Sequence, residues 1–154
     1  MKRALLIILA VVACACNNGI HYYQYQHIEG DAWLQSDTLC FEAAMTDSLH
    51  PNQLEVGLRY TDKYPYQNLR IGVRVLMPDS QLLPMQTIDF QTTDNQGYHL
   101  GMGKGGLFQL QAKPIILPIS KPGTWIIQLS HQMNDSSLVG IHDVGVKIGI
   151  ERRK

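Results

Sequence analysis

Apolar and polar residues alternate along five stretches of the chain, and this period of two is the main pattern in the sequence. The clearest stretch runs from Gln53 to Tyr60, where Leu54, Val56 and Leu58 are separated by polar or small residues. The other four stretches cover residues 68–75, 108–111, 125–130 and 144–151. Successive side chains of a strand point to opposite faces, so each stretch predicts a strand with one buried and one solvated face.

Three weaker strands are expected at residues 22–28, 38–43 and 82–90. Turn-forming residues separate the strands: His50-Pro51-Asn52, Tyr64-Pro65-Tyr66, Met77-Pro78-Asp79 and Lys121-Pro122-Gly123. Beyond the N-terminal segment, no run of ten or more residues has a helical period. About eight short strands with one wet face each predict an all-β fold, an antiparallel β-sandwich. The pattern leaves an open barrel as the alternative.

The N-terminus is typical of a lipoprotein signal peptide. Lys2 and Arg3 precede an apolar run that is too short to cross a membrane and ends in Val11-Val12-Ala13-Cys14. A cysteine that follows a small residue, with an aliphatic residue three places before it, fits the cleavage box of lipoprotein signal peptidases. We therefore expect cleavage after residue 13 and a diacylglycerol, such as one carrying palmitate, on Cys14. Cys16 lies in a poorer version of the same box and is the alternative.

Cleavage would leave 141 residues with 11 basic and 13 acidic side chains, a net charge near −2. This balance gives no electrostatic reason to expect nucleic acid as a partner. Residues 14–20 are then the lipidated anchor and a short tether, and residues 21–154 a single β-sandwich domain. No acidic run follows the anchor, which favours a domain that faces the periplasm. Cys40 lies in an apolar, strand-like stretch and is expected to be a buried thiol.

Motifs for catalysis or cofactor binding find no support in the sequence. The stretch Gly101–Gly106 matches G-x-G-x-x-G, but a strand rather than a helix follows it, so a tight or mobile loop at a sheet edge is expected. The six histidines lack the close spacing of a chelating pair, so we expect no metal site and no cofactor. His131, His142 and Asp143 could meet only across neighbouring strands. The sequence has no nucleophile elbow, and its pattern brings no two carboxylates together as the acids of a glycosidase would be. It therefore predicts no catalytic residues and no enzyme.

Aromatic residues gather just beyond the anchor. Tyr22, Tyr23 and Tyr25, together with Trp33, could form a surface that contacts protein or sugar. The plainer interpretation is a first strand whose alternate residues Tyr23 and Tyr25 cover the edge of the core. For Asp143, which lies where the alternation resumes near the C-terminus, we expect a β-bulge or a carboxylate that caps the backbone.

Several motifs together resemble the gliding-motility lipoprotein H (GldH) family of Bacteroidetes. The opening has the cleavage box, then Tyr22-Tyr23-Gln24-Tyr25-Gln26-His27 and Gly30-Asp31-Ala32-Trp33, followed by Ser36-Asp37-Thr38-Leu39. The closing motif is the most specific part: His131-Gln132-Met133, then Gly140-Ile141-His142-Asp143-Val144-Gly145. The segment 60–70 and the Gly-rich loop also match in position, so the resemblance spans nearly the whole chain.

This resemblance implies a lipid-anchored protein of the bacterial cell envelope that takes part in gliding motility and the associated protein secretion, without an assigned enzymatic activity. Its partners would be the membrane, through the anchor, and other envelope proteins of that complex. A glycan- or peptidoglycan-binding module is the alternative function. Asp37-Thr38-Leu39 and Asp47-Ser48-Leu49 resemble the acceptor tripeptide of periplasmic O-glycosylation in Bacteroidetes, which implies Thr38 and Ser48 as sites.

Overall fold

The computed structural model describes residues 19–46, 51–118 and 121–150, and nearly all of its regular structure is β-strand. The elements in chain order are β1 (Ile20–His27), a short 3-10 turn η2 (Glu29–Asp31), β2 (Ala32–Leu34), β3 (Leu39–Met45), β4 (Asn52–Thr61), β5 (Asn68–Leu76), β6 (Gln86–Gln91), β7 (Met102–Lys104), β8 (Leu107–Gln111), β9 (Ile115–Ile116), β10 (Gly123–His131), β11 (Ser137–Val139) and β12 (Ile141–Ile150). The predicted all-β class is confirmed. Within these ranges, no helix has the length and apolar character needed to cross a membrane.

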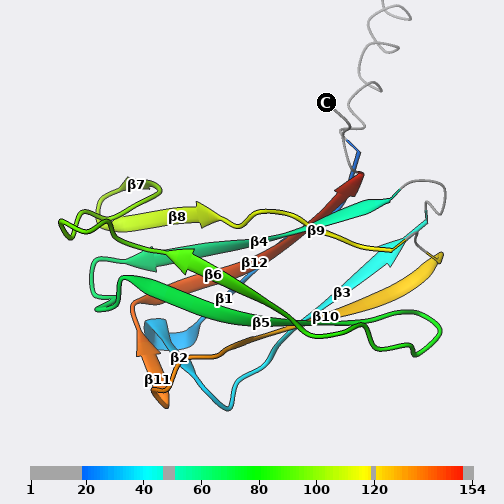
Figure 1. The fold of residues 1–154 in the computed structure, drawn as a ribbon, viewed down its shortest axis with the longest axis horizontal. Coiled ribbons are helices and arrows are strands. Elements are labelled where there is room, and N and C mark those ends of the chain that lie inside the picture. Colours follow the sequence, from blue (N-terminus) through cyan, green and yellow to red (C-terminus); the bar gives the residue numbers. More distant parts are fainter. Residues whose placement is uncertain (1–18, 47–50, 119–120, 151–154) are drawn as a thin grey trace, which may run out of the picture.

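Two antiparallel sheets pack face to face, as the alternation predicts (Figure 1). One sheet has the order β1-β12-β4-β8-β7, with β9 paired to β4 beside β8. The other has the order β3-β10-β5-β6, and a small sheet of β11 and β2 lies at one end of the sandwich. The fold is therefore a sandwich rather than the open barrel.

The core is formed by the inward residues of the long central strands. On β4, Leu54, Val56, Leu58 and Tyr60 are fully buried, and the intervening residues, Gly57 apart, keep some exposure. β12 and β10 contribute to the same core with Val144, Val146, Ile148, Trp125, Ile127 and Leu129. Burial of these apolar side chains supplies the main driving force for the packing of the two sheets.

Two local expectations were wrong. The strand expected at residues 82–90 begins only at Gln86, because Pro84 cannot donate to a ladder, and Leu82 is exposed. Cys40 is exposed instead of buried. In β3 the inward positions are Phe41, Ala43 and Met45, so the side chain before Phe41 points to the opposite face.

The Gly-rich stretch forms a hairpin at the edge of the larger sheet. β7 pairs with β8, and Gly105 and Gly106 make the turn between them with φ angles of 66° and 81°. Glycine adopts such left-handed angles without the steric cost that a Cβ brings. The expected tight turn at a sheet edge is confirmed.

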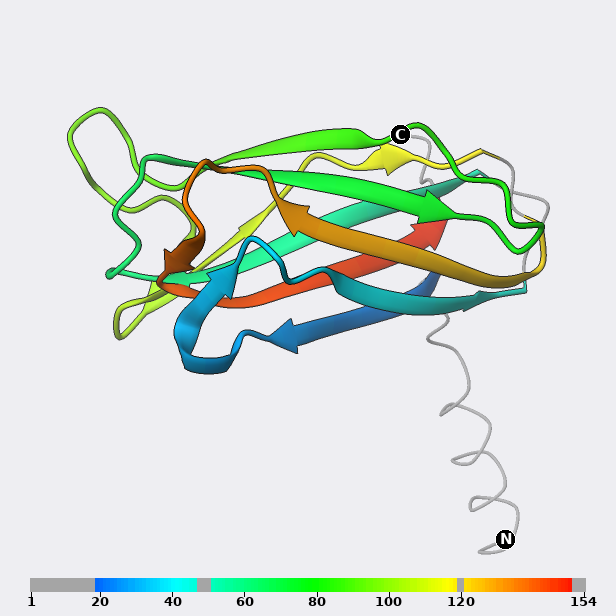
Figure 2. The ribbon, with the colours of Figure 1, turned by 90° about the horizontal axis from the view of Figure 1, so that it is seen from below.

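One end of the sandwich holds the start of β1, and the other holds η2 and the small β2–β11 sheet. β1 starts and β12 finishes at one end, where Ile20 pairs with Gly149 (Figure 2). β1 leads from there to η2 and the small β2–β11 sheet at the far end. His27 is seven residues from Ile20, which corresponds to about 23 Å at about 3.3 Å per strand residue.

Candidate functional site

The outer face of the larger sheet carries the polar and aromatic residues that could bind a partner. β1 forms the edge of this sheet, and Tyr22 on its inner side packs against the core. Tyr23, 53% exposed, and Tyr25 lie on the outer side with their rings edge to face at 5.7 Å. The expectation that Tyr23 and Tyr25 cover the edge of the core was therefore wrong by one residue in the alternation, since Tyr22 does so.

Tyr25 lies flat across the backbones of the two neighbouring strands. A Cβ added at Gly57 of β4 would lie 2.1 Å from its hydroxyl oxygen, and one at Gly145 of β12 only 2.6 Å from its ring. The guanidinium carbon of Arg59 stands 4.1 Å from the ring centroid, and the hydroxyl donates to Oε1 of Gln111 at 3.4 Å. Two glycines thus provide the floor for one aromatic ring, and an arginine covers it.

Trp33 does not belong to this surface, which corrects the expectation made for it. Its side chain is fully buried, its Nε1 donates to the Asp37 carbonyl oxygen at 3.1 Å, and its ring meets that of His131 edge to face. The short strand β2 turns inward where it pairs with β11, and Leu138 opposite Trp33 is buried as well. Trp33 closes the far end of the core.

A β-bulge in β12 brings two neighbouring side chains to the same face of the sheet. Ile141 pairs with Tyr60 and Asp143 with Arg59, which leaves His142 as the extra residue. Such an insertion breaks the alternation, so that His142 and Asp143 lie on the same, outer side while Ile141 points into the core. The bulge expected near Asp143 is confirmed, and the carboxylate contacts side chains across the strands rather than capping the backbone.

Asp143 is the centre of a polar cluster at this bulge. Although only 8% of the residue is exposed, Oδ1 lies 3.2 Å from Nδ1 of His27, and Oδ2 accepts from Arg59 Nη1 at 3.3 Å. Nδ1 of His142 lies 3.0 Å from Oδ2. Burial alone would raise the pKa of the Asp143 carboxyl, but the close approach of the His142 and His27 rings and of the Arg59 guanidinium together holds this pKa below its ordinary value. The carboxylate is therefore ionised at neutral pH.

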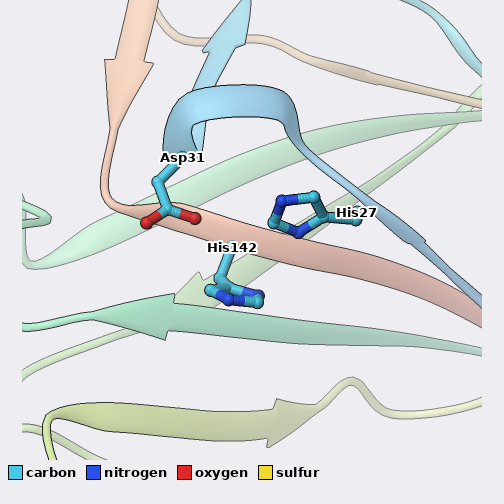
Figure 3. Close-up of side chains that lie close together, drawn as sticks. All are labelled: His27, Asp31 and His142. Atoms are coloured by element: carbon cyan, nitrogen blue, oxygen red, sulfur yellow. The ribbon is translucent and has the colours of Figure 1, made fainter.

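A second cluster is formed by Asp31, which lies in η2, together with His27 and His142. One nitrogen of His27, one nitrogen of His142 and one carboxylate oxygen of Asp31 all lie within 4.8 Å of one another. Figure 3 shows the three side chains converging from the end of β1, from the turn and from β12. Within the described ranges, this is the set of three residues with the composition and spacing to hold a metal ion.

The sequence left open whether His131 meets His142 and Asp143, and the structure shows that it does not. It lies on β10 of the smaller sheet, opposite Ile71, and is 2% exposed beside Trp33. β10 pairs with β3 and β5 and not with β12, so the two histidines occupy different layers.

The modification sites are only partly visible. Cys14, Cys16 and Ser48 lie outside the described residues. Thr38 is exposed in the connection just before β3.

Arg59 and Asp31 were missed by sequence reasoning, because their roles depend on strand pairing that no local pattern shows. The one signal was the position of Arg59 on the polar side of the β4 alternation.

Comparison with known proteins identifies a family for the chain. Residues 20–148 match the model of the GldH lipoprotein family. The chain is 23% identical to the gliding motility lipoprotein GldH of Flavobacterium johnsoniae over 156 residues, which cover 96% of this chain and 95% of that protein.

Solved structures show only a slight likeness. The infectious bursal disease virus VP2 subviral particle gives a TM-score of 0.44 at 12% identity, over 84% of this chain and 32% of that one. Dimeric latent PorU from Porphyromonas gingivalis gives 0.38 at 9% identity, over 88% and 13%. The chain thus spans about a third or less of these proteins, and scores this low do not bear on function. The family match covers most of the residues described above, and the chain belongs to the GldH lipoprotein family.

Proposed function

We propose that the chain is a non-enzymatic lipoprotein of the bacterial cell envelope and a component of the gliding-motility and associated protein-secretion apparatus. The observation that carries this proposal is the family match over residues 20–148, together with end-to-end similarity to a gliding motility lipoprotein. The domain boundaries expected from the sequence complete it: a signal peptide at 1–13, the anchor and tether at 14–20 and the sandwich at 21–154. The lipid is on Cys14, and the domain faces the periplasm.

The outer face around Tyr25 is the surface through which the protein contacts its partners. Tyr23 offers an exposed ring, and Arg59 and Tyr25 form a stacked pair beside it. Tyrosine and arginine dominate the binding energy of many protein interfaces, because they offer a large contact area with few rotatable bonds or several hydrogen-bond donors. Glycines beneath Tyr25 let its ring lie close to the sheet, so that Tyr25 and Arg59 present their contact area at a fixed position.

A glycan- or peptidoglycan-binding module is the weaker alternative. It would need the tyrosines and Trp33 to line one open groove. Trp33 is buried in the core, and Arg59 already covers the ring of Tyr25. Tyr23 is then the one residue of the expected aromatic set that offers an open face to a sugar, which favours the protein-contact function.

The test is deletion and complementation in the native host. We expect deletion to reduce both spreading on agar and the amounts of proteins released into the medium, measured by mass spectrometry. The wild-type gene should restore both, whereas Cys14→Ser and Tyr23→Ala/Tyr25→Ala should restore less than half at equal protein levels. Gln24→Ala, on the other face of the same strand, is the matched control. Unchanged spreading and unchanged release after deletion would refute the proposed function.

Thr38 and Ser48 are also proposed as O-glycosylation sites, and the exposure of Thr38 is consistent with access by a transferase. Peptide mass spectrometry of the native protein should find sugar on both residues. Asp37→Ala should remove it from Thr38 alone, because the acidic residue belongs to the acceptor tripeptide. A peptide carrying unmodified Thr38 at full occupancy would contradict this assignment.

A further inference from the structure

We propose that His27, Asp31 and His142 form a binding site for a divalent transition-metal ion, with Zn²⁺ as the best match. This site goes beyond the proposed function in envelope motility and secretion. Two imidazoles and one carboxylate are a donor set that Zn²⁺ uses in proteins, with a fourth position left for water or another ligand. Hard cations such as Mg²⁺ and Ca²⁺ prefer sites built from oxygen ligands, so the two histidines argue against them.

The donor atoms are already close to the separation that an ion requires. Zn–N and Zn–O distances of about 2.1 Å in a tetrahedral site place ligand atoms about 3.4 Å apart. The three candidate atoms lie within 4.8 Å of one another without an ion. The side chain of His27 is 58% exposed and Asp31 is half-buried, so both can rotate the remaining distance without moving the sheet.

Backbone hydrogen bonds fix the three segments that supply the ligands. The Ile28 amide donates to the His142 carbonyl at 2.9 Å, and the Asp31 amide donates to the Ile28 carbonyl at 3.0 Å. The Gly140 amide in turn donates to the Asp31 carbonyl at 2.7 Å. The Cα positions of all three ligands are therefore held by the ends of β1 and β12, and a rigid scaffold lowers the entropy lost when an ion binds.

Asp31 has a strained backbone that brings its carboxylate toward the histidines. Its φ of 54° is in the left-handed region, which residues other than glycine seldom occupy. Strained residues of this kind cluster at ligand sites, where the surrounding structure holds them in place. Gly30 before it is also left-handed, at 64°, and these two residues turn the chain so that the carboxylate faces the rings (Figure 3).

Asp143 supplies the supporting contact that metal-binding histidines usually have. Its Oδ1 lies within hydrogen-bonding distance of Nδ1 of His27, which leaves Nε2 of that ring with a free lone pair. Nδ1 of His142 is buried and, among the described residues, makes no hydrogen bond of acceptable geometry despite its 3.0 Å distance to Asp143. A bound ion would satisfy a nitrogen of this ring. Asp31 and Asp143 also outweigh the single positive charge of Arg59, which favours a cation.

Such an ion would tie η2 to the bulge of β12 at the far end of the sandwich, beside the surface around Tyr25. Three ligands from this chain leave the fourth position exposed, because His27 and Asp31 lie at the surface. A side chain of another protein could complete the coordination there.

The test is Zn²⁺ titration of the full-length protein in detergent, after treatment with a chelator, by competition with a chromophoric indicator. We expect one ion per chain, with a dissociation constant on the order of 10 μM or lower. His27→Gln, Asp31→Asn and His142→Gln should each weaken binding by at least about tenfold, and Asp143→Asn by about 10- to 100-fold. Zn²⁺ should raise the melting temperature of the wild type but not that of His27→Gln.

The controls separate this site from other ligands of the chain. His21→Gln changes a histidine of the same strand outside the cluster, and Cys16→Ser/Cys40→Ser removes two thiols, so both should bind Zn²⁺ like the wild type. Because His27 is mostly exposed, His27→Gln should fold normally, which its melting temperature without metal will check. Binding that persists in His27→Gln/His142→Gln, or no binding at 100 μM Zn²⁺ (about ten times the expected constant), would overturn the proposal.

Discussion

At the scale of single residues, Tyr25 and the glycine beneath it make the clearest test of the outer face. A Cβ at Gly145 would stand 2.6 Å from the ring, so Gly145→Ala should lift Tyr25 from the sheet and break its contact with Arg59. We expect a loss of about 1–2 kcal/mol in the free energy of unfolding, from the lost burial and cation–π contact. Urea denaturation monitored by tryptophan fluorescence measures this loss.

The same substitution in a Tyr25→Ala background is the control. Without the ring there is nothing for the added methyl group to displace, so Gly145→Ala should then change stability by less than about 0.5 kcal/mol. Equal costs in both backgrounds would show that the glycine is required for a reason other than Tyr25.

His131 provides a pH-dependent test, because its imidazole is buried in the core at 2% exposure. Burial lowers the pKa of this histidine below its ordinary value of 6.5, and the backbone of Trp33 and the charge of Asp135 offset only part of that effect. The unfolded chain therefore takes up a proton at a higher pH than the folded protein does. This difference stabilises the fold fully above pH 6.5, and the stabilisation falls as the pH decreases below that value.

The expected result is a steeper loss of stability in the wild type than in His131→Leu when the pH falls from 7.5 to 5.5. Leucine has a similar volume and no titratable group, so the difference between the two proteins isolates this one histidine from the other five. Urea midpoints at four pH values would measure it. Parallel curves for the two proteins would contradict the buried, neutral state of His131.

The residues also show where sequence reasoning reaches its limit. His142 and Asp143 could be singled out from the chain alone, but their partner His27 lies 116 positions before Asp143 and reaches it only through the pairing of β1 with β12. Trp33 and Cys40 were placed on the wrong side of the surface. Each lies where the flanking run is too short or too mixed for the alternation to assign inner and outer faces.

At the scale of elements, all eight expected strands are present, although the one expected at 82–90 begins only at Gln86. Five of them were indicated by an alternation of apolar and polar residues. The strands that were not expected, β2, β7, β9 and β11, are two or three residues long and so carry no period. Two of them, β2 and β11, pair to form the sheet beside the histidines. The part of the fold that frames the site was therefore the part that the sequence could not predict.

The turn between β11 and β12, at Gly140, holds the small β2–β11 sheet and η2 against the rest of the fold. Gly140 has a φ of 88°, and a Cβ there would lie 2.4 Å from the backbone nitrogen of Tyr64. Its amide also donates to the carbonyl of Asp31. Gly140→Ala should cost about 3 kcal/mol, because strain at a positive φ adds to a collision with a backbone that cannot rotate away. Thermal and urea unfolding would measure this cost.

Gly97→Ala is the matched control for that prediction. Gly97 has nearly the same φ, 86°, but nothing lies within 4 Å of its added Cβ. Alanine there should cost about 1 kcal/mol, from the left-handed angle alone. The difference of about 2 kcal/mol is the part due to close packing against Tyr64, and similar costs at the two positions would refute that packing.

At the scale of the whole molecule, the direction of β1 relates the site to the anchor. The strand begins at the end where the described chain starts and finishes at His27, about 23 Å farther along. With a lipid on Cys14 and a tether of a few residues, the end with Ile20 would face the membrane. The histidine cluster would then lie at the end away from the membrane, and the surface around Tyr25 along the side of the sandwich.

This orientation depends on the anchor, so the position of the lipid is the decisive prediction for the whole protein. Intact-mass analysis of protein from detergent extracts of the native host should show a chain that begins at Cys14 and carries a diacylglyceryl group. Cys14→Ser should abolish both cleavage and lipid, because the thiol of this residue is the expected attachment site. Cys16→Ser should leave mass and location unchanged, apart from the substitution itself. A lipid that disappears with Cys16→Ser instead would move the anchor by two residues, whereas an unlipidated chain would remove the basis for placing the sandwich against a membrane.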